Sequence, residues 1–215
     1  MMSWTLALDT STVVEAAVMH DGQVAATGTV DDARAHAEQL APLVQRLLTE
    51  SGIAPGDLTD VVVGVGPGPF TGLRVGVATG MTLAEVIGIP VHGVCSLDAV
   101  AAQWANEGAP AEFLVVSDAR RREVYWARYD ASGQRLEGPH VGAPSTLPAL
   151  PLAGPGAALV GEPTGPARLS AAYLAASSLP DAGLEPLYLR RPDAEVSHQV
   201  KSTLPRTRSS VSRTR

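Results

Sequence analysis

Glycine-rich stretches that lead into helices often bind phosphate, and this sequence contains one, GVGPGPFTGLRVG, from Gly64 to Gly76. A phosphate-binding P-loop needs the pattern G-x-x-x-x-G-K-[ST], in which a lysine reaches the outer phosphate oxygens. The only lysine in the chain is Lys201, far from this stretch. The dinucleotide pattern G-x-G-x-x-G also fails, because its third glycine position falls on Pro69 or Thr71. The spacing therefore excludes both common phosphate loops.

What remains is a rigid turn that leads into a helix predicted from about Leu73 to Ile87. Pro67 and Pro69 lack the backbone N–H groups that an anion would bind. The N-terminus of the helix still favours negative charge, with Thr71 as its cap and Arg74 close by. Thr71 and Arg74 are therefore the candidate anion-binding residues.

Two aspartates that each end an apolar segment form a second candidate site. Residues 6–23 and 115–134 share one plan: a strand ending on aspartate, a polar turn, a second strand opened by glutamate, and another turn. Asp9 matches Asp118 and Asp21 matches Asp130, both at an offset of 109. The repeat predicts a duplicated lobe, with the alternative that any two hairpins share such features.

If these hairpins were the phosphate loops of an ATPase, glycine should follow each aspartate so that the backbone can approach phosphate. Asp9 is instead followed by Thr10-Ser11-Thr12, and Asp118 by Ala119 and three arginines, Arg120 to Arg122. We therefore interpret Asp9, Ser11 and Asp118 as degenerate phosphate-loop positions. The arginine run is typical of a solvated turn, with phosphate binding as the alternative.

Metal chemistry has little support in the sequence. The five histidines include no pair at i, i+4 and no H-E-x-x-H pattern, so no metal site is predicted. The single cysteine, Cys95, excludes a disulfide framework, and we expect it to be buried and structural. No cofactor is predicted.

Charge is distributed unevenly along the 215 residues. Residues 1–195 hold 11 arginines and 22 acidic residues, a net charge of −11, whereas residues 196–215 hold one lysine and four arginines without an acid. The acidic body is unlike a nucleic-acid-binding protein, so RNA is expected to bind indirectly or through the basic tail. Residues 195–215 lack apolar periodicity and are predicted to be disordered. With no secretion signal and no long apolar run, we expect a cytoplasmic protein with no membrane contact.

Two helices carry patterned apolar faces. The first has Leu40, Leu43, Val44 and Leu47 at helical spacing. The second has small residues every four positions, at Gly76, Gly80 and Ala84. Glycine inside a helix costs about 1 kcal/mol relative to alanine, so we expect another backbone to pack closely there. That neighbour is either an internal element or a protein partner.

Farther along the chain the predicted elements are weaker. Residues 138–168 are rich in proline, glycine and alanine, with one short strand expected at residues 157–161. A modest helix is predicted from about Ala167 to Ser177, and a final strand at residues 185–191. The second lobe is therefore expected to be the smaller.

Four segments of this sequence, LALDTS, GVGPGPFTGLRVG, DARRREVYWARYD and YLRRPDA, closely resemble the TsaB (also YeaZ) family across residues 4–194. The resemblance implies an α/β fold of the actin/Hsp70-like (ASKHA) type, with two lobes of duplicated mixed sheets flanked by helices. The first lobe is expected over residues 1–108 and the second, reduced lobe over residues 109–194. Two departures are a short second lobe and Pro69, where serine is common in the family.

The resemblance also implies a function in making N6-threonylcarbamoyladenosine (t6A) in tRNAs that read ANN codons. In the family, TsaB is a non-catalytic paralogue that pairs with the transferase TsaD, while the ATPase TsaE joins the complex. Pairing uses the two first-lobe helices, which favours the partner interpretation of the small-residue stripe, and the same surface is expected to form a homodimer when the chain is alone. The implied interface residues are Leu40, Leu43, Val44, Leu47, Gly76, Val77, Gly80, Met81 and Ala84.

Three alternative functions make different predictions. An active ASKHA ATPase or small-molecule kinase should bind Mg-ATP in calorimetry. A metallopeptidase should retain metal on purification. An RNA-binding module that uses the tail should lose tRNA when residues 196–215 are deleted.

Overall fold

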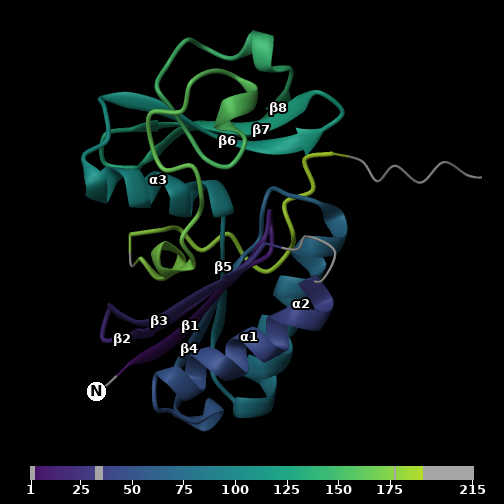
Figure 1. Cartoon of the computed structure of the whole chain (residues 1–215), viewed down its shortest axis with the longest axis vertical. Coiled ribbons are helices and arrows are strands. Elements are labelled where there is room, and N and C mark those ends of the chain that lie inside the picture. The colour runs from purple at the N-terminus through teal and green to yellow at the C-terminus, as the bar shows by residue number, and fades with distance from the viewer. Residues whose placement is uncertain (1–2, 32–35, 177, 191–215) are drawn as a thin grey trace, which may run out of the picture.

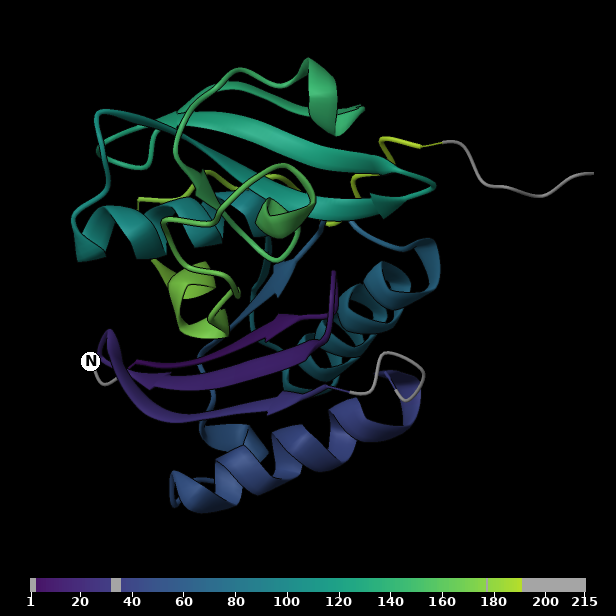
Figure 2. The ribbon, with the colours of Figure 1, turned by 45° about the horizontal axis from the view of Figure 1, so that its top comes forward.

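The structure is a computed structural model that describes residues 3–31, 36–176 and 178–190 (Figure 1). Two β-sheets lie one above the other, with one helix between them and two helices covering the outer face of the first sheet (Figure 2). The predictions for the 195–215 tail fall outside the described residues.

The first sheet has the strand order β3-β2-β1-β4-β5. Three antiparallel strands come first along the chain, and two strands parallel to the first then extend the sheet. The turn between β2 and β3 is formed by Asp21 and Gly22, which have φ angles of 49° and 78°. Positive φ at both central residues is the pattern of a type I′ turn, for which Asp-Gly is favourable. The strands are β1 (Trp4–Asp9), β2 (Val14–His20), β3 (Gln23–Val30), β4 (Asp60–Gly64) and β5 (Val91–Val94).

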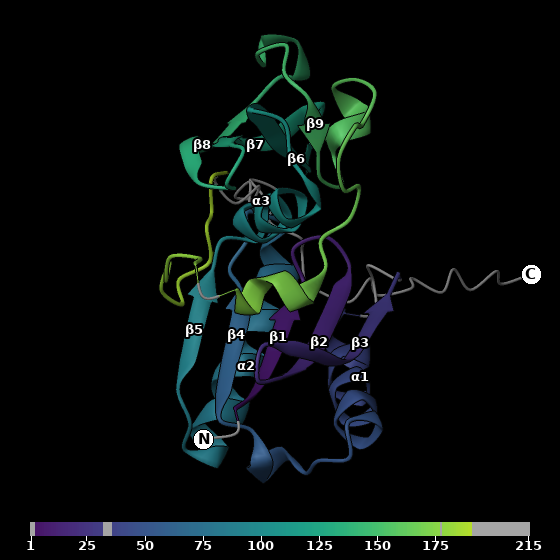
Figure 3. The same cartoon turned by 90° about the vertical axis from the view of Figure 1, so that its left-hand side faces the viewer.

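The second sheet repeats this plan in the order β8-β7-β6-β9 (Figure 3). Again three antiparallel strands are followed by a strand parallel to the first, and the described residues contain no counterpart of β5. Asp9 ends β1, and Asp118 lies at the corresponding position near the end of β6. The duplicated, mixed arrangement with a reduced second lobe is thus confirmed. These strands are β6 (Glu112–Arg120), β7 (Glu123–Asp130), β8 (Arg135–Gly142) and β9 (Leu152–Ala153).

The helices divide between the two faces of the first sheet. α1 (His36–Glu50) and α2 (Phe70–Ile87) cover its outer face, whereas α3 (Ser96–Glu107) lies between the sheets (Figures 1 and 2). One core cluster therefore joins residues of both sheets, for example Ala7 and Val62 with Phe113 and Tyr129. The lobes share this core because α3 packs against the second sheet. Short 3-10 helices are η1 (Pro55–Asp57), η2 (Pro144–Thr146), η3 (Ala157–Leu159) and η4 (Ala171–Ala175).

Three elements of the second lobe differ from the sequence predictions. The strand expected at residues 157–161 is the 3-10 helix η3, and the helix expected from about Ala167 shrinks to η4. Residues 185–190 form no strand, although Leu187 N donates to Val65 O at 2.8 Å and ties this segment to the first lobe. Elements this short are fixed by tertiary contacts, because propensity over five residues is a weak signal.

The small-residue stripe of α2 faces the sheet and not solvent. A Cβ atom on Gly80 would lie 2.3 Å from Val63 Cγ1, and one on Gly76 would lie 2.3 Å from Thr10 Oγ1. By length and composition α2 alone among the described helices could span a membrane, but core helices of soluble proteins pass the same test, so this indication is weak. The close neighbour that the glycines require is therefore an internal one.

This packing covers most of the residues of the predicted partner interface, which stays a prediction. Eight of the nine residues are buried in the first lobe, because the spacing that suggests a docking face is the spacing by which a helix covers its own sheet. Met81 is the exception, with 44% of its surface exposed. The buried eight are Leu40, Leu43, Val44, Leu47, Gly76, Val77, Gly80 and Ala84.

Replacing Gly80 by leucine should destabilise the isolated protein rather than only a complex. The new side chain would overlap Val63, and overpacking of this kind costs about 3 kcal/mol. Urea unfolding followed by circular dichroism measures the change. The control is Ala78→Leu on the exposed side of α2, expected to change stability by less than about 0.5 kcal/mol. Equal stability of Gly80→Leu and the wild type would contradict this packing.

Candidate functional site

The carboxylate of Asp9 lies at the end of β1 and is bonded within the protein. The residue is 1% exposed. Its Oδ1 accepts hydrogen bonds from the backbone N–H (2.7 Å) and hydroxyl (2.6 Å) of Ser11, and its Oδ2 accepts one from the hydroxyl of Ser96 (2.5 Å). Ser96 Oγ in turn accepts the N–H of Gly66 at 3.1 Å. One carboxylate thus connects the first hairpin, the glycine stretch and the start of α3.

The glycine stretch packs against the hydroxyl-rich loop that follows Asp9. A Cβ on Gly64 would lie 1.8 Å from Asp9 Oδ2, and one on Gly68 would lie 2.5 Å from Ser11 O. The hydroxyl of Thr10 donates to Gly72 O at 2.8 Å. The glycines therefore allow two parts of the chain to touch, and their lack of side chains serves internal packing.

Asp118 is bonded differently. Its Oδ1 accepts the N–H of Arg120 at 2.7 Å, and its Oδ2 lies 3.3 Å from Arg120 Nη1. It is not among the residues that line the cavity beside Asp9. The structure places the two aspartates at matching ends of the two sheets without bringing Asp118 into that cavity.

The cavity lies between the first hairpin and loops of the second lobe, and it has a volume of about 230 Å³. Arg168 lines it and reaches across to Asp31 at 2.8 Å, an exposed ion pair between the lobes. The described residues contain no group of three or more histidine, cysteine, aspartate or glutamate side chains that could hold a metal ion. The lining residues are Asp9, Thr12, Val13, Glu15, Pro155, Ala167, Arg168 and Leu169.

Glu15 gives this cavity a titratable group near neutrality. The pKa of its carboxyl is raised from 4.5 to about 7, mainly by burial and to a smaller extent by the negative charges of Asp9 and Asp31. The hydroxyl of Thr29, which donates to Glu15 Oε2 at 2.9 Å, and the charge of Arg168 lower this pKa in part. The sequence predicts Glu15 only as the first residue of a strand. Its raised pKa could not be predicted, because the burial by the second lobe that causes it depends on the tertiary structure.

The N-terminus of α2 differs from the predicted anion site. The helix begins at Phe70 with Pro69 at the cap position, so Thr71 lies inside the first turn and is not the cap. The Arg74 guanidinium stacks over the Phe70 ring at 3.9 Å, and its Nε donates to the hydroxyl of Tyr188 at 2.9 Å. Arg74 is thus held by two aromatic side chains, while Thr71 is exposed beside them.

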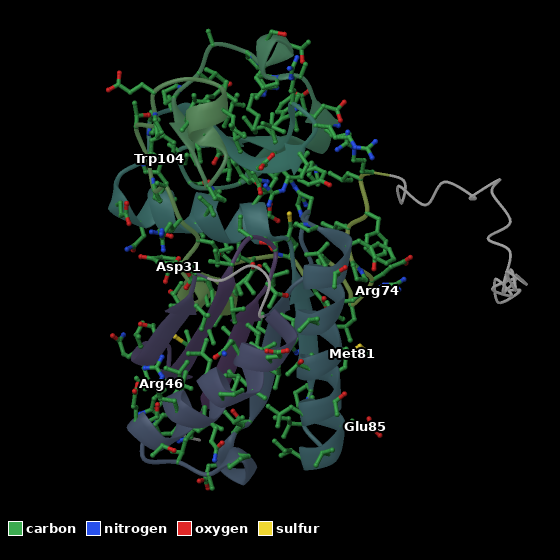
Figure 4. The ribbon with its side chains drawn as sticks, turned by 45° about the vertical axis from the view of Figure 1, so that its right-hand side comes forward. Asp31, Arg46, Arg74, Met81, Glu85 and Trp104 are labelled. Carbon is green, nitrogen blue, oxygen red and sulfur yellow. The ribbon has the colours of Figure 1, made fainter. Side chains whose placement is uncertain are left out.

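The outer side of α2 offers an exposed, partly apolar surface. Phe70, Met81 and Val86 are 38%, 44% and 79% exposed. Arg74, Met81 and Glu85 point outward along the helix in Figure 4. On the other flank of α2, which faces α1, a groove of about 440 Å³ separates the two helices, and it is lined by Ala41, Val44, Gln45, Leu48, Thr49, Ile53, Pro55, Thr79 and Leu83.

The turn between β6 and β7 is strained. Arg120, Arg121 and Arg122 have φ angles of 63°, 51° and 64°, in the left-handed region that costs a non-glycine residue about 1 kcal/mol or more. The equivalent type I′ position between β2 and β3 uses Asp-Gly, which avoids most of this cost. All three arginine side chains are exposed.

A buried polar pair that joins α3 to the second sheet escapes sequence reasoning. Asp98 is 2% exposed and accepts a hydrogen bond from the hydroxyl of Tyr129 at 2.7 Å, while Arg135 lies 3.6 Å from its Oδ2. Cys95 is buried nearby, as predicted, and burial raises the pKa of its thiol to about 12. At that pKa the thiol is protonated and inert at neutral pH.

The chain is similar to a known protein family and to several known proteins. A family model described as TsaD, tRNA N6-adenosine threonylcarbamoyltransferase, matches residues 30–195. An uncharacterised protein of Mycobacterium tuberculosis is 48% identical over 206 residues, which cover 90% of this chain and 95% of that protein. The Escherichia coli tRNA threonylcarbamoyladenosine biosynthesis protein TsaB is 39% identical over 126 residues, 58% of this chain and 54% of that protein.

Two solved structures from Pseudomonas aeruginosa have a fold similar to that of this chain. YeaZ from Pseudomonas aeruginosa matches with a TM-score of 0.68 at 27% identity, over 80% of this chain and 89% of that chain. A second Pseudomonas aeruginosa structure is described as similar to peptidase YeaZ. It matches with a TM-score of 0.71 at 29% identity, over 88% of this chain and 100% of that chain. Together with the repeated strand order, these matches confirm the actin/Hsp70-like fold.

Ser96→Ala should reveal how much the buried network around Asp9 stabilises the fold. It removes the hydroxyl that donates to Asp9 Oδ2, and losing a buried hydrogen bond to a charged group costs about 2 kcal/mol. Ser132→Ala is the matched control, because that hydroxyl donates to Asp130 at 2.6 Å on the exposed surface. Urea unfolding of both variants makes the comparison. Equal losses would contradict a special contribution of the buried network.

Stability should also depend on pH through Glu15. Its pKa is higher in the folded state, about 7, than the ordinary 4.5, so folding favours its protonated form. Its contribution to stability is full below pH 4.5 and is lost as the pH rises through 7, a change on the order of 2 kcal/mol. Glu15→Gln should remove this dependence in thermal melts between pH 5 and pH 8, whereas the exposed Glu162→Gln should keep it. A wild-type profile that Glu15→Gln leaves unchanged would refute the assignment.

Proposed function

The chain belongs to the TsaB (YeaZ) family, whose members act in the biosynthesis of threonylcarbamoyladenosine in tRNA, and from this premise we propose that it is a non-catalytic subunit that activates TsaD. In this proposal TsaD transfers the threonylcarbamoyl group, and the present chain pairs with it in the cytoplasm. TsaE joins the larger complex, and the chain alone forms a homodimer through the same surface. The first lobe of residues 1–108 carries the pairing surface, and residues 109–194 form the second lobe.

The observation that carries the proposal is the internal bonding of Asp9. Both of its carboxylate oxygens accept hydrogen bonds from serines of the same chain. A carboxylate that coordinates the metal of a nucleotide, or accepts a proton from a substrate, must present an oxygen to it. The side chains of Ser11 and Ser96 stand where such a ligand would bind.

The charge of the cavity also supports a non-catalytic function. Asp9 and Glu15 both line it, with Arg168 paired to Asp31 at its edge. The two carboxyl groups disfavour a bare phosphate group, and no lysine lies in residues 1–195 to offset them.

For the pairing surface we propose the exposed side of α2 together with the α1–α2 groove. Phe70 and Met81 supply large exposed apolar side chains on one flank of the helix, and Val86 lies toward the other flank, where the groove runs. Interfaces of this type bury aromatic and methionine anchors within a polar rim, here provided by Arg74 and Glu85 (Figure 4). The small residues Gly76, Gly80 and Ala84 contribute to this surface only indirectly, because they let α2 pack closely against the sheet.

Activation then follows from differential binding. A subunit without chemistry of its own shifts its partner toward a competent state only if it binds that state more tightly than the other. Because α2 rests against β4 through Gly80, its outer surface is held rigidly. A rigid surface of this kind suits selection of one partner conformation.

Met81→Glu should weaken pairing with TsaD at least tenfold while the isolated chain stays folded. The change introduces a charge into an exposed apolar surface, and a buried unpaired charge at an interface costs several kcal/mol. Co-elution and a t6A assay on tRNA mixed with both proteins measure the effect. The matched control is Val24→Glu, because Val24 is 55% exposed on β3, away from α2.

Two results would count against this proposal. Full co-elution and activity of Met81→Glu would place the interface elsewhere. Threonylcarbamoyl transfer by this chain without TsaD would overturn the non-catalytic assignment.

A further inference from the structure

We propose that the β6–β7 turn, Arg120–Arg122, binds the phosphate backbone of RNA and so helps to hold the tRNA on the paired subunits. The inference rests on the proposed function, because it names a second partner for the same complex. Its site is distinct from the pairing surface: the turn belongs to the second lobe, whereas α1 and α2 cover the first sheet (Figure 1).

The turn concentrates positive charge on a body that is otherwise acidic. Three consecutive exposed arginines form the tip of the hairpin, and the Arg120 side chain is 72% exposed. Asp118 offsets part of the charge of Arg120, and Glu123 is paired to Arg190. The three guanidinium groups lie on exposed residues at the end of the hairpin, where they can approach a polyanion that the acidic surface elsewhere repels.

Arg190 adds to this charge and brings the end of the described chain to the same place. Its Nη1 donates to Ala119 O at 2.7 Å and also to Arg120 O at 3.4 Å. The sequence continues from here with Arg191 and, after Glu195, with one lysine and four arginines and no acidic residue.

The backbone of the turn points to a use for the arginine side chains. Glycine, asparagine or aspartate would adopt positive φ at lower cost, as Asp21 and Gly22 do in the first lobe. The chain instead keeps arginine at three strained positions in succession. Strain of this kind is found where the side chain has a function that a relaxed turn would not supply.

RNA fits this surface better than a membrane does. Membrane-binding surfaces combine basic side chains with exposed large apolar ones. Within the described residues, the exposed large apolar side chains lie elsewhere, at Val24, Phe70, Met81, Val86, Leu136 and Leu159. Guanidinium groups without apolar neighbours suit phosphate contacts, which give affinity without base specificity.

The test is the double change Arg121→Asn and Arg122→Gly, which creates a favourable type I′ turn while removing two positive charges. The probe is an unmodified transcript of a tRNA that reads ANN codons, titrated with the paired subunits and with the chain alone by fluorescence anisotropy. We expect the dissociation constant to rise roughly tenfold at about 100 mM salt, and the slope of log K against log salt to fall by about 1.5. The melting temperature should stay the same or rise.

Two control variants separate charge from turn shape. Arg121→Lys with Arg122→Lys keeps the charge and should bind tRNA within about threefold of wild type. Arg128→Gln removes one charge from the same strand, where Arg128 is paired to Glu112 and Glu137, and should leave the salt slope unchanged. An equal loss of tRNA binding in Arg128→Gln would overturn a specific site at the turn.

The other outcomes of these titrations also test whether the turn binds RNA. Unchanged tRNA affinity and salt slope in the Asn-Gly variant would overturn the proposal, as would binding of the wild type to anionic lipid vesicles without binding to tRNA. Co-elution with TsaD is measured separately on every variant. If the wild type fails to pair with TsaD, the proposed function fails, and the titration of the chain alone still decides whether the turn binds RNA.

Discussion

The buried carboxylate of Asp9 holds together three segments that are far apart in the sequence. It accepts hydrogen bonds from Ser11 in the first hairpin and from Ser96 at the start of α3, and Ser96 also binds the glycine stretch through Gly66. A buried charge is tolerated only when such bonds satisfy it. This requirement fixes where α3 begins, and α3 carries the core that both sheets share.

Close packing of glycine decides which side of α2 is free. Gly76 and Gly80 bring the helix within contact of Thr10 and Val63, so the side with small residues is covered. Phe70 and Met81 lie on the flank of the helix that stays exposed. Arg74 stacks over Phe70 and donates to the hydroxyl of Tyr188, and it so links this surface to the segment that continues toward Arg190.

Charge separates the two candidate surfaces from the cavity. The cavity beside Asp9 is lined by two carboxyl groups, and burial gives one of them, Glu15, a pKa of about 7. The basic residues gather instead at the β6–β7 turn and beyond Arg190. A chain with net negative charge can thus approach RNA over a limited region, with its apolar helix surface left for a protein partner.

The sequence by itself determined the duplicated fold, since strand-ending aspartates at a constant offset and turn residues such as Asp21-Gly22 are local signals. It also excluded the two common phosphate loops, because their spacing is a property of the sequence. Only the tertiary structure decided which face of α2 is buried, that Thr71 is not the helix cap, and that Glu15 titrates near neutrality. Helical periodicity marks an apolar face without saying what covers it, and a pKa depends on residues distant in sequence that exclude water.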